Sequence, residues 1–209
     1  MLRHMTRAAL RGMALLAVLA MAAPAAAEKK VQITPQQRVQ MSVFLSNFTE
    51  LLMMGFEAAK LTREELIDFG IWHNYRNNYK SRIVQCGKKQ CDFGGLCIDS
   101  KYVAESVKKY FNVALQEHGE VSAKHARYGW DGKKYHFDGA DGEALWYARV
   151  KDVYESDAGQ LKLTGEVYLA EDENSAPKHA FVAWVMPRVD KGKNSWTIVG
   201  FKVADTWFR

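Results

Sequence analysis

The sequence predicts an α+β fold: three N-terminal helices and a small hairpin, packed on a C-terminal, curved antiparallel meander of four to six strands. Two observations predict it. Apolar residues recur at helical spacing in the first half of the chain, and from about residue 125 the period changes to two. Turn signals at Asp131-Gly132 and at 157–159 then separate the alternating runs. Helices that precede strands along the chain indicate an α+β domain.

The first 27 residues have the pattern of a secretory signal peptide. Three arginines and no acidic residue accompany a short apolar run at 13–23, and three alanines at 25–27 form a small-x-small cleavage pattern. We therefore expect a mature chain that begins at Glu28, in the periplasm or secreted, with no stable membrane anchor. The alternative is an uncleaved N-terminal anchor, which the short apolar run disfavours.

The remainder, 28–209, has the length of one α+β domain. The whole chain carries 29 basic and 24 acidic residues; without the three arginines of the signal, 26 basic residues face 24 acidic ones, a net charge of +2. This near balance predicts no nucleic acid partner.

The two first helices begin at capping boxes. Thr34 and Gln37 form one, with Pro35 at the first helical position, and Thr62 and Glu65 form the other. The first helix is expected to fade near Gly55, the second to run through 70–80, and a third to span about 100–117. The apolar stripe of the first is Met41, Phe44, Leu45, Phe48, Leu51 and Leu52, and the buried side of the third is Val103, Val107, Tyr110, Phe111 and Ala114.

Strands are expected at about 144–155, 160–171, 178–189 and 195–204. The segment 180–187 is apolar on both faces and needs cover on both. A loop, a curled sheet edge, a ligand cavity or a second copy of the chain would supply it, so a homodimer through the sheet face is one expectation.

This element order, over most of 34–204, resembles the ketosteroid-isomerase-like, or nuclear-transport-factor-like, α+β cone superfamily. The resemblance implies a curved sheet wrapped around helices, with a pocket between them. A cystatin-like arrangement of a helix on a sheet is the alternative. The chain also resembles exported bacterial proteins to which no activity is attached, and this likeness implies no chemistry.

The candidate pocket residues are polar or aromatic groups at the end of the second helix and on the doubly apolar strand: His73, Tyr75, Arg76, Asn77 and Trp184. Buried polar groups usually find partners within the fold. A satisfied structural network is therefore favoured over a pocket lining for 70–80.

Three cysteines, Cys86, Cys91 and Cys97, lie in a chain expected to meet an oxidising compartment. If 87–90 is a hairpin turn, Cys86 and Cys91 face each other and form a disulfide. Pairing of Cys97 with either of them stays open. Four and five residues between the cysteines, without a nearby histidine pair, disfavour zinc, so neither a metal nor a cofactor is predicted.

Asp138, Asp141 and Glu143 are predicted to form a turn rather than a calcium loop. The sequence has no motif of a hydrolase or a phosphate-binding loop. We therefore expect a non-catalytic ligand-binding or envelope-accessory module, whose partner is a small molecule or an envelope protein. The alternative is a small-molecule lyase or isomerase with a cone-fold pocket.

Overall fold

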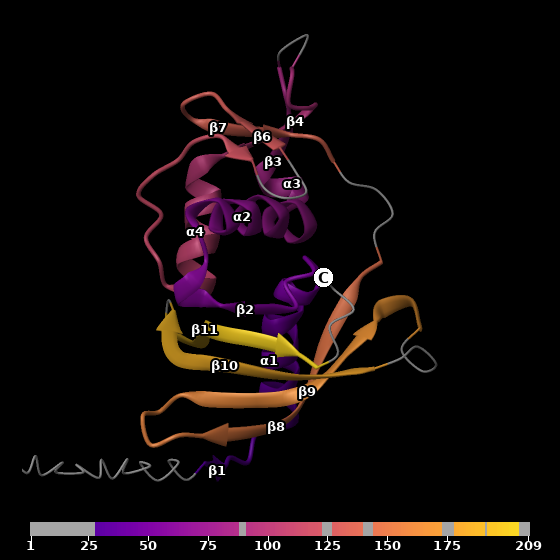
Figure 1. Ribbon diagram of the computed structural model, residues 1–209, viewed down its shortest axis with the longest axis vertical. Coiled ribbons are helices and arrows are strands. Elements are labelled where there is room, and N and C mark those ends of the chain that lie inside the picture. The colour runs from indigo at the N-terminus through magenta and orange to yellow at the C-terminus, as the bar shows by residue number, and fades with distance from the viewer. Residues whose placement is uncertain are drawn as a thin grey trace, which may run out of the picture.

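The computed structural model describes residues 28–87, 91–122, 127–139, 144–172, 178–190 and 192–204. The predicted signal peptide lies outside these residues. The α+β class is confirmed: helices lie between two antiparallel sheets, a large one and a small one (Figure 1). Among the described residues, no helix is both long and apolar enough to span a membrane.

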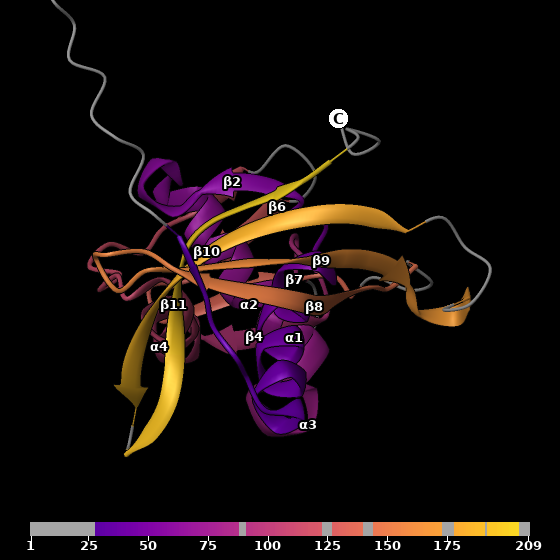
Figure 2. The ribbon, with the colours of Figure 1, turned by 90° about the horizontal axis from the view of Figure 1, so that it is seen from below.

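The large sheet has six strands in the order β1-β8-β9-β10-β11-β2. The four long strands expected from the alternating pattern are all present. The strands are β1 (Lys29–Lys30), β2 (Gly55–Glu57), β8 (Trp146–Glu155), β9 (Leu161–Leu169), β10 (His179–Asp190) and β11 (Lys193–Val203), with the 3-10 turns η1 (Ala58–Lys60) and η2 (Ala170–Asp172). Register shifts at 150–152 and 184–185 bend the long strands, and Figure 2 shows their curvature.

Helix α1 (Pro35–Thr49) covers the edge of this sheet through its hydroxyl side chains. The Val150 and Ala148 N–H groups of β8 donate to Ser42 Oγ and Ser46 Oγ, both at 3.0 Å. Thr49 Oγ1 donates to the Trp146 carbonyl at 2.7 Å. Since β1 pairs only with 154–155 of β8, these bonds satisfy backbone groups that an edge strand would otherwise leave open.

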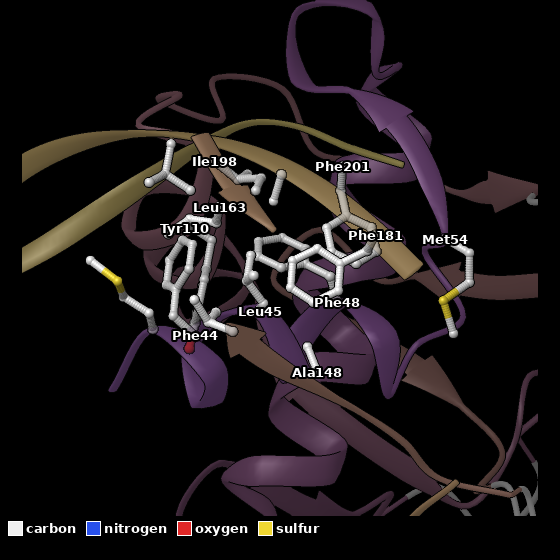
Figure 3. Close-up of a cluster of buried hydrophobic side chains, with 14 of the residues drawn as sticks. Phe44, Leu45, Phe48, Met54, Tyr110, Ala148, Leu163, Phe181, Ile198 and Phe201 are labelled. Atoms are coloured by element: carbon white, nitrogen blue, oxygen red, sulfur yellow. The ribbon is translucent and has the colours of Figure 1, made fainter. Parts of the chain in front are cut away.

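The first hydrophobic core lies between the large sheet and the helices (Figure 3). Phe48 is completely buried at its centre. Its ring lies 5.3–5.7 Å from five other aromatic rings, those of Phe44, Phe56, Phe69, Tyr110 and Phe111. The inward face of β10 contributes Phe181, Ala183 and Val185, while Val182, Trp184 and Met186 on its other face are half-buried or exposed.

The small sheet has the order β3-β4-β7-β6-β5 and rests on the other side of the helix pair α2–α4. The elements are α2 (Arg63–Asn77), α3 (Tyr79–Arg82), α4 (Ser100–Phe111), β3 (Ile83–Gln85), β4 (Leu96–Asp99), β5 (Val121–Ser122), β6 (Arg127–Trp130) and β7 (Lys134–Phe137). A second core fills this interface: Ile67, Ile71, Ile83, Leu96, Ile98, Val103, Tyr128, Tyr135 and Phe137. The pair α2–α4 therefore contributes side chains to both cores.

Both capping boxes are confirmed. Two helix ends were predicted wrongly. The first helix ends at Thr49 rather than near Gly55, because Leu52 takes a left-handed conformation (φ 56°) and the Met53 N–H donates back to the Phe48 carbonyl, a Schellman-type stop. Leu52 is consequently 47% exposed.

The third helix ends at Phe111 rather than 117, because Asn112 adopts the left-handed conformation at its C-cap. Ala114, expected on the buried side of that helix, is exposed as a result.

Candidate metal centre

The candidate metal ligands are Cys86, Cys91, Cys97 and His136. Two of them form a cross-strand pair of the small sheet. Cys97 on β4 is directly opposite His136 on β7, so both side chains project from the same face. Cys86 directly follows β3, and its N–H donates to the Gly95 carbonyl at 2.7 Å, which continues the β3–β4 ladder. Since Val84 is the register partner of Cys97, Cys86 lies two residues further along the same face.

Cys91 reaches the same place through a tight loop. The Gly94 N–H donates to the Cys91 carbonyl at 3.4 Å, and Gly94 has a φ of +117°, which favours glycine. A Cβ at Gly94 would meet the backbone of Phe137 and Asp138, and one at Gly129 would meet the Phe93 ring. The two close approaches fix the loop against β6 and β7.

The three sulfurs surround one nitrogen. His136 Nδ1 lies 3.2 Å from Cys86 Sγ, 3.5 Å from Cys91 Sγ and 3.4 Å from Cys97 Sγ. The ligand atoms of Cys86, Cys91 and His136 all lie within 4.8 Å of one another, whereas Cys97 Sγ is not that close to all three of them. Zinc bond lengths of about 2.3 Å to sulfur and about 2.0–2.1 Å to nitrogen place tetrahedral S and N ligands about 3.6 Å apart, close to these separations.

Asp131 orients the imidazole. Its Oδ2 lies 2.7 Å from His136 Nε2, and its Oδ1 accepts bonds from the Lys133 and Lys134 N–H groups at 2.9 and 2.7 Å. The hydrogen bond from His136, followed by that from the Lys134 N–H, holds the pKa of the Asp131 carboxyl well below its usual range. With the proton on Nε2, the Nδ1 lone pair points at the sulfurs, the arrangement typical of a metal-bound histidine.

The thiols of this cluster are shielded from solvent to different degrees. Cys97 and His136 are only 3% and 4% exposed, while Cys86 and Cys91 are half-buried. Burial, and then a hydrogen bond with Cys86, raises the pKa of the Cys97 thiol to about 12. A divalent cation reverses this preference, because it stabilises the thiolates directly. Cys97 would complete a Cys₃His set of four, with no open position on a tetrahedral ion, once its Sγ moves in toward the group formed by Cys86, Cys91 and His136.

The hairpin register used to predict the Cys86–Cys91 disulfide is wrong. β4 begins at Leu96, so Cys86 pairs with Gly95 rather than with Cys91. All three cysteines are free in the structure. The disulfide itself stays a prediction, and residues 88–90 of the expected turn lie outside the described residues.

The candidate pocket residues from the sequence do not form one site, although Asn77 Nδ2 lies 3.4 Å from His73 Nδ1. His73 is 4% exposed, stacked on Phe69 with ring centroids 5.5 Å apart, and it lines a cleft beside α4. Tyr75 packs between Trp72 and Phe137 in the second core. Arg76 is half-buried, and Asn77 is exposed and donates to Glu50 at 3.3 Å. Trp184, on the outer face of β10, does not line this cleft.

The expected polar network in this stretch is centred on Asn74. Asn74 Nδ2 donates to the Gly70 and Tyr102 carbonyls and to Ser106 Oγ, at 2.7–3.2 Å, while its Oδ1 accepts from Arg82 at 2.9 Å. Asn74 is completely buried. These contacts join α2 to α4.

Sequence reasoning missed His136, because it searched for a histidine near the cysteines along the chain. The signal was its place in an alternating strand just after the Asp131-Gly132 hairpin turn, which the structure confirms. Asp138 Oδ1 accepts from the Gly95 N–H at 3.4 Å, a turn contact, while Asp141 and Glu143 lie outside the described residues.

Comparison of the chain with models of protein families, with curated proteins and with solved structures gives no match. The function therefore has to be argued from the site.

Proposed function

We propose that this protein is an exported, non-catalytic binding module whose small sheet is held together by one zinc ion. The observation that carries the proposal is that a single nitrogen, His136 Nδ1, faces three sulfurs. One lone pair lies within 3.5 Å of three sulfurs, and it can accept a hydrogen bond from only one of them. A cation at the centre of the four groups would satisfy all of them, and three soft sulfurs with one imidazole favour zinc.

The competing reading is a disulfide between two of the three thiols, which an oxidising compartment favours. It would leave one thiol over, and it has no use for a buried histidine oriented by Asp131. A structural zinc ion would give all five groups a role, with the three thiols and His136 as ligands and Asp131 orienting the histidine. The signal peptide and the periplasmic or secreted location are part of this proposal and rest on the composition of residues 1–27.

A closed, four-coordinate site supports a structural role, because catalytic zinc keeps a position for water or substrate. The binding activity is then placed elsewhere in the fold. We propose the cone-like arrangement for the large sheet, supported by α1 and the α2–α4 pair on the side that carries the first core. The outer face of β10, with Trp184 half-buried and Met186 exposed, would suit a second copy of the chain or an envelope partner.

A lyase or isomerase is the second candidate, since buried His73 lines a cleft with Glu105. Burial, followed by the charges of Lys109 and Arg82, lowers the pKa of His73 to about 3, which keeps the imidazole neutral but makes it a weak base at neutral pH. Glu105, however, is paired with Arg82 at 3.3 Å. We favour the binding module because no second acid or base is paired with His73 among its described contacts.

The test is the metal content and thiol state of protein purified from the cell envelope. Zinc binding predicts one zinc per chain by elemental mass spectrometry and three thiols that become reactive only after chelation in denaturant. A Cys86–Cys91 disulfide predicts no zinc and one reactive thiol. Replacement of zinc by cobalt should give the visible bands of a tetrahedral thiolate complex.

Variants further distinguish a zinc site from a disulfide. His136→Ala should abolish zinc retention, whereas a disulfide would be indifferent to it. Asp131→Asn should weaken zinc binding by about 10–100-fold, the usual cost of losing such an orienting group. His118→Ala is the matched control, because His118 contacts Tyr135 and Trp130 in the same small sheet but not the cysteines. Zinc retained equally by His136→Ala and His118→Ala would contradict the proposal.

A further inference from the structure

A second site lies beside helix α4, apart from the candidate metal ligands. It is a cleft of about 770 Å³ between α4, the end of α3, the segment that follows α4 and the end of β10. This volume lies within the range of small-molecule sites, about 300–1,000 Å³. None of the four candidate metal ligands lines it.

Its walls carry an excess of positive charge. Five basic side chains line it, against the two acidic ones of Glu105 and Asp190; the basic ones are Arg82, Lys101, Lys108, Lys109 and Arg188. Glu105 pairs with Arg82 at 3.3 Å and Asp190 with Arg188 at 3.6 Å. Both acids are thus engaged by arginines, and the three lysines provide the surplus charge. The chain as a whole is nearly balanced, so this excess is local.

Arg188 carries a buried donor that the fold does not satisfy. Its Nη1 donates to the Lys108 carbonyl at 3.3 Å, which ties the end of β10 to the last turn of α4. Its Nε is buried and has no hydrogen-bond partner. A buried N–H without an acceptor is costly, and native structures usually place an acceptor there.

Some of the other residues that line the cleft are uncharged. His73 is neutral at neutral pH, since burial and neighbouring cations lower its pKa. Asn78 adds an amide, and Ala114 and Leu115 add apolar surface. The anionic groups of a ligand bound here would contact the basic side chains. Its uncharged part would contact the neutral hydrogen-bonding and apolar residues.

We propose that this cleft binds a small organic polyanion, a molecule with two or more carboxylate or phosphate groups. One oxyanion lies against the guanidinium of Arg188, and the lysines of α4 neutralise the remaining charge. An arginine and several lysines at one cleft are the usual means of holding such groups. This inference deepens the proposed binding function but needs no zinc, so it can fail or succeed separately from the metal site.

Isothermal titration calorimetry of the purified protein tests it, with citrate, succinate, glycerol phosphate and inorganic phosphate as probes at constant ionic strength. We expect saturable binding of citrate or succinate with one site per chain, and weaker binding of the two probes that carry a single phosphate group. Saturable binding of the single-phosphate probes alone would contradict the requirement for two or more anionic groups. The absence of saturable binding at millimolar concentrations of all four would overturn the proposal. Weak, equal binding of all four that disappears with added salt would also overturn it, because it indicates only surface charge.

The decisive variant is Arg188→Gln, which should weaken the binding by about tenfold or more, the size expected for one charge-assisted hydrogen bond. Lys101→Gln, on the exposed face of α4, should weaken it by less. Arg63→Gln is the matched control, because Arg63 pairs with Glu64 outside the cleft. Thermal midpoints confirm that each variant is folded, and if Arg188→Gln does not fold, Lys108→Gln takes its place. Equal affinities for wild type and the cleft variant would refute the site.

Discussion

The two halves of this fold are held together in different ways, although they share the helix pair α2–α4. The large sheet has four strands of 9–12 residues and buries a continuous aromatic and aliphatic core. The described strands of the small sheet have two to four residues each. Short strands bury little apolar surface, so the small sheet depends more on local links, of which the cysteine–histidine cluster is the strongest candidate.

The comparison indicates that the two halves have different sources of stability. Apolar burial contributes roughly 25 cal/mol per Å² and needs no particular chemistry, so we expect the large half to be stable without a metal ion. A metal ion stabilises the folded state only when all of its ligands are correctly placed. It then links segments that are distant along the chain. Four predictions test this difference.

The largest effect is expected in the first core. Phe48→Ala removes a completely buried ring that contacts five other rings, and should cost about 3–5 kcal/mol of global unfolding free energy. Phe137→Ala, equally buried in the second core, should instead open the small sheet with less effect on the large one. Hydrogen exchange read strand by strand distinguishes them. Equal loss of protection in both sheets for both variants would show that the halves do not differ as described.

Metal removal is expected to act on one half only. Chelation should destabilise β3, β4, β6 and β7 relative to the zinc-bound protein by about 2.7 kcal/mol when free zinc stands at a hundred times its Kd. Exchange in β9 and β10 should stay almost unchanged. Cooperative melting of both sheets on chelation would contradict the independence of the large half.

The helix layer between the two halves should respond to acid through His73. Its pKa is lowered to about 3, so the unfolded chain binds a proton below its ordinary pKa of 6.5 and the folded chain does not. Stability is therefore present above pH 6.5 and falls as the pH falls toward 3, by about 2 kcal/mol between pH 7 and pH 5. Urea midpoints of wild type and His73→Gln should converge over this range. A constant gap between them would refute the assignment to His73.

Helix caps should have the smallest effect. Thr62→Ala removes the hydrogen bond from the Glu65 N–H at the start of α2 and should cost about 1 kcal/mol. Thr34→Ala does the same at α1 and serves as the partner variant in the large half. Denaturant midpoints measure both. A cap effect well above the loss of about 2 kcal/mol assigned to His73 between pH 7 and pH 5 would reverse the order expected here.

Local signals made part of this fold predictable from the sequence. The capping boxes, the helical spacing of Phe44 and Phe48, and the alternation of 161–169 each depend on neighbours along the chain. The ends of α1 and α4 were missed because they depend on left-handed conformations of Leu52 and Asn112, the first of which has no local sequence signal.

The candidate site was less predictable because it depends on register. Cys97 contacts His136, which lies 39 positions further along the chain, across two neighbouring strands. A shift of one position in either strand would turn one of the two side chains to the opposite face. Nothing local in the cysteine spacing carries that information. The pairing follows only once β4 and β7 are known to be neighbours.

X-ray absorption at the zinc edge tests the central claim most directly, because it reads the ligands of the ion in the purified protein. We predict three sulfur neighbours at about 2.3 Å and one nitrogen at about 2.0–2.1 Å in the wild-type protein, and no bound zinc to measure in His136→Ala. A zinc ion surrounded only by oxygen and nitrogen, or a protein that retains no zinc after dialysis, would contradict the account.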